Sequence, residues 1–414
     1  MNSPNAKFWI WLSQALGYDT PKVKVLRGLY PDIAVFYSGG EHEWRYCGKL
    51  SEKDIASLSK TPLSVAESIL ESCARFGYSV LAIDDPNYPK CLYNIYDPPA
   101  VLYIEGKLPD VDHRLTIGIV GTRRATEYGV SNSYKIGYAL GKYGVCTVSG
   151  GALGVDCAAH RGTLAADGTT ICVRGCGINC SYLSENAGMR RTITQKGAVI
   201  SEYPPYTEPR SFHFPARNRI ISALSDGVVI IESGKRSGSL ITANLALEQG
   251  KEVFALLGNN SPQNEGSNAR IKEGSAIPIT DFMDILNAFD GLYLTDEEEK
   301  VIVDLDSISL ADINAVPIKG KRQTPAEPIH ELFKTARSRT KQTEQPKPTA
   351  VHRVDVKLEG DMAAVYRVLT DQPVNIDDIS RQLSLPVYRV LTAMTQLQMK
   401  DLVNSYPGRK FSLK

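Results

Sequence analysis

Hydrophobic residues change their spacing along the chain, and each spacing predicts a different kind of element. Up to about residue 85 they recur every three or four positions, as in Phe8, Trp9, Leu12 and Leu16, with turn residues between the groups. This spacing gives each of several short helices one apolar face. Residues 1–84 are therefore predicted to form a small helical domain.

Short β-rich runs follow, and each ends near Gly or Ser before a helical stretch. Their apolar character is continuous rather than alternating, which is typical of strands buried on both faces of a sheet. The strand–helix–strand repeat predicts an α/β domain over residues 85–290, with a Rossmann-like, doubly wound, mostly parallel sheet. The predicted strands are Leu115–Gly121, Val145–Ser149, Thr169–Gly175, Ala198–Ser201, Gly227–Glu232 and Glu252–Leu257.

The composition shifts after this domain. Residues 281–306 hold nine acidic residues against Lys300 alone, and residues 319–350 are basic and rich in Pro, Thr and Gln. Such low-periodicity sequence is typical of linkers, so residues 291–358 are predicted to form a flexible one, first acidic and then basic.

Residues 359–414 regain a regular pattern. Three helical stripes and a hairpin pattern predict the winged variant of helix-turn-helix. Its third helix, Val387 to Lys400, carries only Arg389 and Lys400 as basic residues. A helix that reads the major groove usually has more donors, so protein contact or weak duplex binding is at least as compatible with this domain.

Composition narrows the function classes. The 414 residues include 47 Lys and Arg against 46 Asp and Glu, which excludes a polycationic protein but not a local basic patch. No apolar run is long enough for a membrane span, and the N-terminus does not resemble a signal peptide. The eight cysteines are spread over apparent strands and helices, so reduced thiols are favoured over a disulfide scaffold. We therefore expect a cytoplasmic protein.

Candidate chemistry lies in the loops after the predicted strands, where ligands bind in doubly wound sheets. Three of these loops are Gly-rich turns into helices: Gly121–Arg124, Ser149–Asp156 and Ser233–Ala243. Such turns present backbone N–H groups to anions, and Arg123 and Lys235 add positive charge, which predicts a phosphate-binding rim. Neither a dinucleotide fingerprint nor a P-loop occurs, so tightly bound NAD or ATP is disfavoured and no cofactor is expected.

A fourth loop interleaves aromatic and basic residues. Phe212, Phe214, Arg217 and Arg219 all lie within eight positions. This mixture can stack bases and hold a single-stranded backbone. Aromatic packing with arginines in surface ion pairs is an equal alternative from the pattern alone.

Catalytic and metal-binding patterns are weak. His160 follows Asp156 by one helical turn and could act as a base, although a role in bracing the helix is favoured. Cys172, Cys176 and Cys180 are evenly spaced but have no fourth ligand at zinc spacing. The sequence therefore predicts neither an enzyme nor a metal site.

At these loops the sequence resembles the bacterial DNA-processing protein A (DprA/Smf) family. The stretches that carry the resemblance run in the family's order: Gly118–Arg123, Val148–Ala152 with Gly154, Asp156, Ala159 and His160, Ile200–Pro204, Phe214–Ile221, and Ser237–Ala243. Residues 1–84 resemble the sterile-alpha-motif-like or helix-hairpin-helix extension of some members, and residues 361–414 their winged-helix domain. The chain departs from the usual pattern at Gly151, where many members have Leu, and at Tyr182-Leu183, where many have Tyr-Pro.

The resemblance implies a non-enzymatic homodimer that binds and protects incoming single-stranded DNA in natural transformation. It also implies that the protein helps to load RecA recombinase onto that strand, often displacing single-strand-binding protein. By motif match the DNA-binding residues would be Arg123, Ser149, Gly150, Phe214, Arg217, Asn218, Arg219, Lys235, Ser237, Gly238 and Ser239.

A nucleotide-processing enzyme or nucleotide sensor of the same superfamily is the alternative. The turn at Ser233–Ser239 corresponds to the nucleotide loop of such enzymes, but the catalytic Glu that they carry shortly after it is missing, and the next acidic residue is Glu248.

Overall fold

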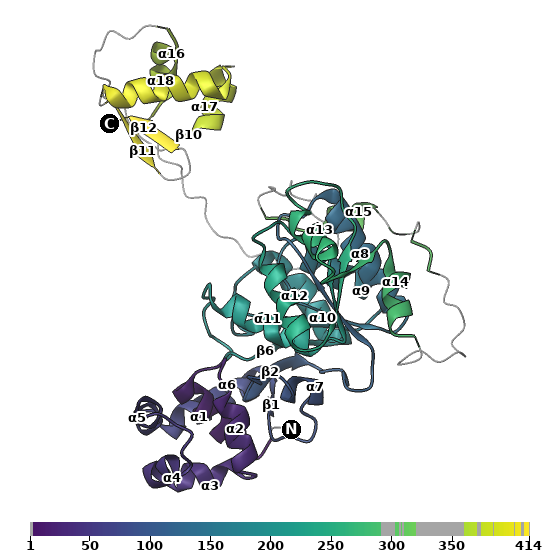
Figure 1. Cartoon of the computed structure of the whole chain (residues 1–414). Helices are drawn as coiled ribbons and strands as arrows, with labels where there is room; N and C mark the ends of the chain where they lie inside the picture. Colours follow the sequence, from purple (N-terminus) through teal and green to yellow (C-terminus); the bar gives the residue numbers. More distant parts are fainter. Residues whose placement is uncertain are drawn as a thin grey trace, which may run out of the picture. The chain divides into compact units, whose positions relative to one another are not determined.

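Figure 1 shows the computed structural model of the chain, which contains two compact units, residues 1–327 and residues 328–414. The structure describes residues 3–290, 303–305, 308, 310–319, 360–370, 374–383, 385–400, 402–406 and 410–413.

The first unit begins with six short helices, as the apolar spacing predicts. They pack around a cluster of buried aromatic side chains, in which the Trp11 ring lies 5.7 Å from Trp44 and 6.4 Å from Phe36. The Trp11 indole also donates to the carbonyl of Thr61 at 2.7 Å, which satisfies its buried N–H. The helices are α1 Ala6–Leu16, α2 Lys22–Leu29, α3 Ile33–Ser38, α4 Gly40–Tyr46, α5 Glu52–Lys60 and α6 Leu63–Phe76.

A nine-stranded sheet forms the centre of this unit, in the order β1-β2-β6-β5-β4-β3-β7-β8-β9. The seven strands from β6 to β9 are parallel, which confirms the predicted fold class, and all six predicted strands are present with ends shifted by at most two residues. The strands are β1 Ser79–Ala82, β2 Val101–Gly106, β3 Thr116–Val120, β4 Cys146–Ser149, β5 Thr170–Arg174, β6 Ala198–Ser201, β7 Gly227–Ile230, β8 Glu252–Leu256 and β9 Ile277–Ile279.

Strand β1 corrects the expectation that residues up to about 85 are helical. It pairs antiparallel with β2, and β2 pairs antiparallel with β6, so the end of the predicted helical region belongs to the sheet. Helix α1 packs against both strands, which joins the N-terminal helices to the sheet in one compact unit.

Helices cover both faces of the parallel strands, as buried strands require. Alternate residues of β7 show this: Val228 and Ile230 join one apolar cluster, and Val229 and Ile231 join the other. The first cluster includes residues of α11 and α12, and the second includes residues of α8, α9, α10 and α14. The remaining helices of the unit are α7 Lys90–Tyr93, α8 Glu127–Lys142, α9 Val155–Ala165, α10 Ala187–Lys196, α11 His213–Ala223, α12 Gly238–Glu248, α13 Glu265–Lys272 and α14 Phe282–Ala288, with the 3₁₀ turn η1 Ser184–Asn186.

Part of the predicted flexible linker is packed against the sheet unit. Helix α15 (Leu310–Asn314) contacts α8, and Ile313 and Val316 are 7% and 4% exposed. The segment then bonds to two loops at the strand ends: Gly154 N–H donates to the carbonyl of Pro317 at 2.8 Å, and Lys319 N–H donates to that of Arg123 at 2.9 Å. The rest of the predicted linker lies mostly outside the described residues.

The second unit has the predicted winged-helix elements. Its helices are α16 Gly360–Val368, α17 Ile376–Leu383 and α18 Val387–Met399, and its sheet has the order β10-β12-β11 with strands Val374–Asn375, Lys410–Leu413 and Val403–Tyr406. Arg389 of α18 donates twice to the Asp361 carboxylate, each time at 2.7 Å. One of the two basic residues of this third helix is thus held by a neighbouring helix.

All eight cysteines lie in the described residues and are free thiols, as the composition predicts. Among the described helices, none combines the length and the apolar character needed to cross a bilayer.

Candidate nucleic-acid interface

Two adjoining pockets open where the central parallel strands end. The larger, called the outer pocket below, has a cavity volume of about 430 Å³ and lies between the loop after β3 and the start of α12, which follows β7. These neighbouring strands lead to helices on opposite faces of the sheet, which is the point where doubly wound folds bind ligands. The smaller, called the inner pocket, has a volume of about 20 Å³ and lies beside the loops after β4 and β5.

Arg217 of α11 lines both pockets. Its side chain is buried, with 4% of the residue exposed, and its Nη1 donates to the carbonyls of Gly150, at 2.9 Å, and Val173. A Cβ on Gly150 would lie 2.5 Å from Nη2 of Arg217, so a larger residue there would have to displace the guanidinium. Burial lowers the pKa of Arg217, and the Asp156 carboxylate opposes that shift. The loop after β4 therefore positions a buried cation.

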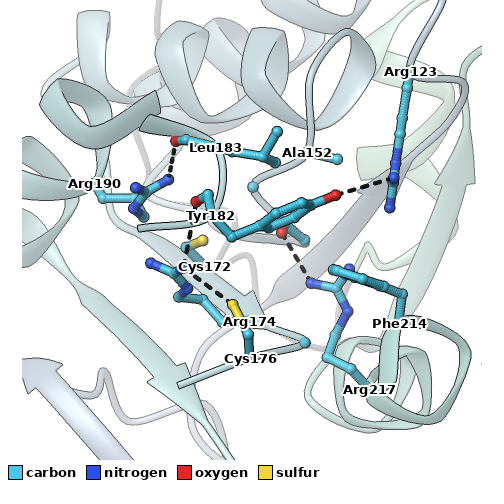
Figure 2. A pocket seen from close by; sticks show the side chains of 13 residues that line it. Arg123, Ala152, Cys172, Arg174, Cys176, Tyr182, Leu183, Arg190, Phe214 and Arg217 are labelled. Atoms are coloured by element: carbon cyan, nitrogen blue, oxygen red, sulfur yellow. Dashed lines mark hydrogen bonds between the residues drawn. The ribbon is translucent and has the colours of Figure 1, made fainter. Parts of the chain in front are cut away.

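Arg123, Phe214 and Tyr182 form a second contact set at the boundary of the pockets (Figure 2). The guanidinium of Arg123 lies 5.2 Å from the centre of the Phe214 ring, at cation–π distance, and its Nη1 donates to the Tyr182 hydroxyl at 3.3 Å. The Tyr182 and Phe214 rings are 5.2 Å apart. The loops after β3 and β5 and the start of α11 thus bring one cation and two aromatic rings together.

The N-terminus of α12 lines the outer pocket opposite Arg123. Ser237 caps the helix by accepting from Ser239 N–H, and Ser239 Oγ donates to Ser233 Oγ at 3.0 Å. Asn218 of α11 donates to the carbonyl of Gly238 at 3.3 Å and holds this turn against the pocket. The positive end of this helix favours anions here.

The structure thus brings together most of the residues predicted for DNA binding. Those that line one or both pockets are Arg123, Gly150, Phe214, Arg217, Asn218, Ser237, Gly238 and Ser239. Ser149 is not among the lining residues: it is 1% exposed and donates to the carbonyl of Ile119 at 2.6 Å, which ties β4 to β3 below the pockets. Lys235 lies in the loop before α12 with its side chain 77% exposed, 3.4 Å from Glu265.

Arg219 is not part of this cluster, which corrects its place in the predicted basic set. Its side chain is 4% exposed and donates to both oxygens of Glu202 at 2.6 and 2.9 Å, and it also lies 3.1 Å from Asp97. Burial disfavours the charge, but Glu202 outweighs that effect and the pKa of Arg219 is raised. Arg217 and Arg219 are two positions apart on α11, so a helix turns them to opposite sides. Arg219 has a structural role as a paired buried cation.

Sequence reasoning missed Arg174 and Arg190, which both line the inner pocket. Arg174 ends β5 and donates to the carbonyls of Ile178 at 3.2 Å and Cys180 at 2.9 Å, which shapes the loop that carries Tyr182. Arg190 of α10 donates to the carbonyl of Leu183 at 3.0 Å. An Arg at the end of an otherwise apolar strand is an unusual signal, and it could have identified Arg174.

Acidic groups are scarce at the site. Asp156 is the only carboxylate among the residues that line either pocket in the described chain. Burial raises its pKa, and Arg217 opposes the shift. Glu232, at the end of the β7 run, instead accepts from Thr126 Oγ1 at 2.5 Å and Thr126 N–H at 2.8 Å, which fixes the start of α8. The pockets are therefore suited to binding an anion.

His160 has the bracing role that the sequence analysis favoured. It is fully buried, its Nδ1 is 2.7 Å from Thr170 Oγ1, and burial together with the charge of Arg217 lowers its pKa to about 3. A neutral, buried imidazole that contacts a neighbouring strand links α9 to β5 and does not line either pocket.

Comparison with known proteins places this fold and site in one family. Residues 79–290 match the family model described as DNA recombination-mediator protein A, and residues 345–409 match the DprA winged helix domain. The Smf protein of Synechocystis is 32% identical over 339 residues, which cover 80% of this chain and 79% of that protein. The Smf protein of Escherichia coli is 34% identical over 311 residues, 73% of this chain and 80% of the relative.

A solved structure agrees. The X-ray structure of DNA processing protein A from Streptococcus pneumoniae has 32% identity and a TM-score of 0.54, and the match covers 70% of this chain and 99% of that one. A Rossmann-like sheet whose strand ends hold basic and aromatic side chains, followed by a winged helix, defines a class of DNA-processing proteins. Within that class, the chain belongs to the DNA recombination-mediator protein A family, also named DprA or Smf.

Proposed function

We propose that the protein binds single-stranded DNA at the outer pocket and helps to load RecA recombinase onto it during natural transformation and recombination. The convergence of Arg123, Arg217 and Phe214 on the helix end of α12 carries the DNA-binding proposal. Guanidinium groups and helix N–H groups bind backbone phosphates, and aromatic rings next to them stack bases without reading sequence. Family membership supports the role in transformation.

In this proposal the strand runs over the outer pocket, with Arg123, Lys235 and the α12 turn on its phosphates. The protein acts without catalysis, as a homodimer in the cytoplasm, and hands the strand to RecA in place of single-strand-binding protein. The scarcity of carboxylates at the pockets supports the binding of a polyanion, because few fixed negative charges repel its phosphates.

The test compares two double variants by fluorescence anisotropy with an unstructured oligonucleotide. Arg123→Ala with Lys235→Ala removes two proposed phosphate contacts, whereas Arg124→Ala with Arg236→Ala removes two exposed charges from the same loops. For single strands, the slope of log affinity against log salt falls by roughly 0.7 for each lost contact, so the first variant should flatten it by about 1.4. The control should change it less.

Equal behaviour of the two double variants, with both folded, would contradict the proposed interface. The RecA step is tested separately by adding RecA to strands coated with single-strand-binding protein. Wild-type protein should accelerate filament formation, and the Arg123→Ala, Lys235→Ala variant should not. Release of free base from nucleoside monophosphates would instead favour the nucleotide-processing alternative.

A further inference from the structure

The inner pocket gathers positive charge that carboxylates outside its lining, Asp156 and Glu105, offset only in part. Arg123, Arg174, Arg190 and Arg217 line it, and no Asp or Glu does. In the described part of the chain, none of the four forms an ion pair, although other arginines such as Arg219 and Arg270 do. Buried cations are normally paired, so this concentration of guanidinium groups indicates a site for an anion.

Unused donors remain on these arginines. Arg217 is 4% exposed, and its buried Nε has no hydrogen-bond partner among the described residues. Arg190 donates one hydrogen bond, from Nη1 to the carbonyl of Leu183. Arg174 donates to the carbonyls of the loop after β5, so it contributes its charge to the pocket rather than a hydrogen bond. Burial lowers the pKa of both Arg217 and Arg190, so a bound anion would stabilise their charged forms. A buried N–H without a partner costs free energy that a ligand oxygen can offset.

The size of the inner pocket restricts the ligand. Its volume of about 20 Å³ compares with about 430 Å³ for the outer pocket. A cavity needs roughly 10–15 Å³ to hold one water molecule, so the inner pocket is too small for a nucleobase and admits at most one small group. It shares Arg123, Ala152, Phe214 and Arg217 with the outer pocket, so such a group enters from there.

We propose that the inner pocket binds a phosphate monoester, carried by the end of a DNA strand or by a free nucleotide. A monoester has a charge of about −1.5 to −2 at neutral pH, against −1 for an internal phosphate, and it bears a chain on one side only. Both properties fit the small, strongly basic inner pocket beside the wider outer pocket. The strand-end source rests on the proposed function, because the strand must first occupy the outer pocket.

The experiment uses the full chain and oligonucleotides of one sequence with a 5′-phosphate, a 3′-phosphate or hydroxyls at both ends. We expect one terminal phosphate to tighten binding by about tenfold or more, since hydrogen bonds to charged groups are involved. Arg190→Gln should abolish this preference and leave the affinity for the hydroxyl-ended strand within about twofold, because Arg190 lines the inner pocket alone. The matched control is Arg191→Gln, an exposed neighbour on α10, and Arg190→Lys should restore part of the preference.

A second arm distinguishes the source of the monoester. Inorganic phosphate and a nucleoside 5′-monophosphate are titrated calorimetrically into wild type and Arg190→Gln. Binding to the wild type alone assigns the pocket to a free nucleotide or phosphate, even if strand ends give no preference. If neither arm shows a phosphate effect, or if Arg190→Gln leaves that effect unchanged, the inference is overturned. In that case tight binding of the hydroxyl-ended strand would leave the proposed function standing, whereas the absence of strand binding would refute the proposed function itself.

Discussion

Arg217→Met should destabilise the first unit, and the loss should depend on pH through Asp156. Arg217 donates to the carbonyls of Gly150 and Val173 and supplies the cation that faces the buried Asp156 carboxyl group. Methionine keeps much of the side-chain volume but removes both hydrogen bonds and the charge. The substitution therefore separates a packing role from an electrostatic one.

The sign of the pH effect follows from the pKa of Asp156. Burial raises this pKa above its unfolded value of 3.8, so the folded state holds the proton to higher pH and the carboxyl group contributes most stability in acid. That contribution is lost as pH rises through the folded pKa. Arg217 opposes the shift, so its removal raises the pKa of Asp156 further and leaves an unpaired carboxylate at neutral pH.

The expected loss is about 3 kcal/mol at pH 7, where the buried carboxylate has lost its compensating cation. The loss should be smaller near pH 4, because protonation of Asp156 removes the unpaired charge and leaves only the lost carbonyl hydrogen bonds, at about 1.5 kcal/mol. Asp156→Asn in the Arg217→Met background should remove the pH-dependent part of the loss.

Urea unfolding followed by tryptophan fluorescence measures these losses. The chain has three tryptophans, Trp9, Trp11 and Trp44, and all lie in the first unit, so the second unit does not contribute to the signal. An equal loss at pH 4 and pH 7, or a double variant as pH-sensitive as Arg217→Met, would refute the reasoning.

Three further outcomes are expected. Gly150→Ala places a Cβ 2.5 Å from Nη2 of Arg217 and should weaken single-strand binding by about tenfold in anisotropy titrations. The control is Gly188→Ala, whose added Cβ has its nearest neighbouring atom 4.0 Å away, and it should leave the affinity unchanged. Arg219→Met should lower the unfolding free energy by about 3–5 kcal/mol because it leaves the buried Glu202 carboxylate without its cation. The folded variant should keep the wild-type salt slope of DNA binding. A flatter slope would show that Arg219 contacts the DNA. His160 has a pKa of about 3 in the folded protein, so it opposes folding as pH falls below about 6.5, by up to about 1.4 kcal/mol per pH unit. In urea titrations between pH 7 and pH 5, His160→Gln should therefore lose stability less steeply than the wild type. Parallel stability curves for the two proteins would contradict this.

Local pattern predicted six of the seven parallel strands, because each of the six is largely apolar and ends near Gly or Ser. It missed β9, in which only Ile279 is buried. It also missed β1 and β2. Strand β2 pairs with β6, which joins residues about a hundred positions apart, as in Tyr103 with Ser201. Long-range antiparallel pairing leaves little signal in a short segment that follows a helix and a Pro-rich stretch.

The sequence predicted the site residues that lie on loops after parallel strands, because those loops meet at one edge of the sheet. Arg219 was placed in the basic set because aromatic and basic residues alternate along residues 212–219. This segment is a helix, and its geometry turns Arg219 away from Arg217. Arg190 could not be found in this way, since it lies within a polar helix and reaches the inner pocket only through the fold of the loop at Leu183.

The segment at 310–319 also has a mechanical consequence. The backbones of Pro317 and Lys319 bond to those of Gly154 and Arg123. Tension that reached Lys319 from its C-terminal side would therefore act on the Arg123 loop before it acted on a strand of the sheet. A pull strong enough to break these two bonds would detach this segment from the loop that carries Arg123 while the sheet stayed intact, so load on the segment would act first on the position of the proposed DNA-binding cation.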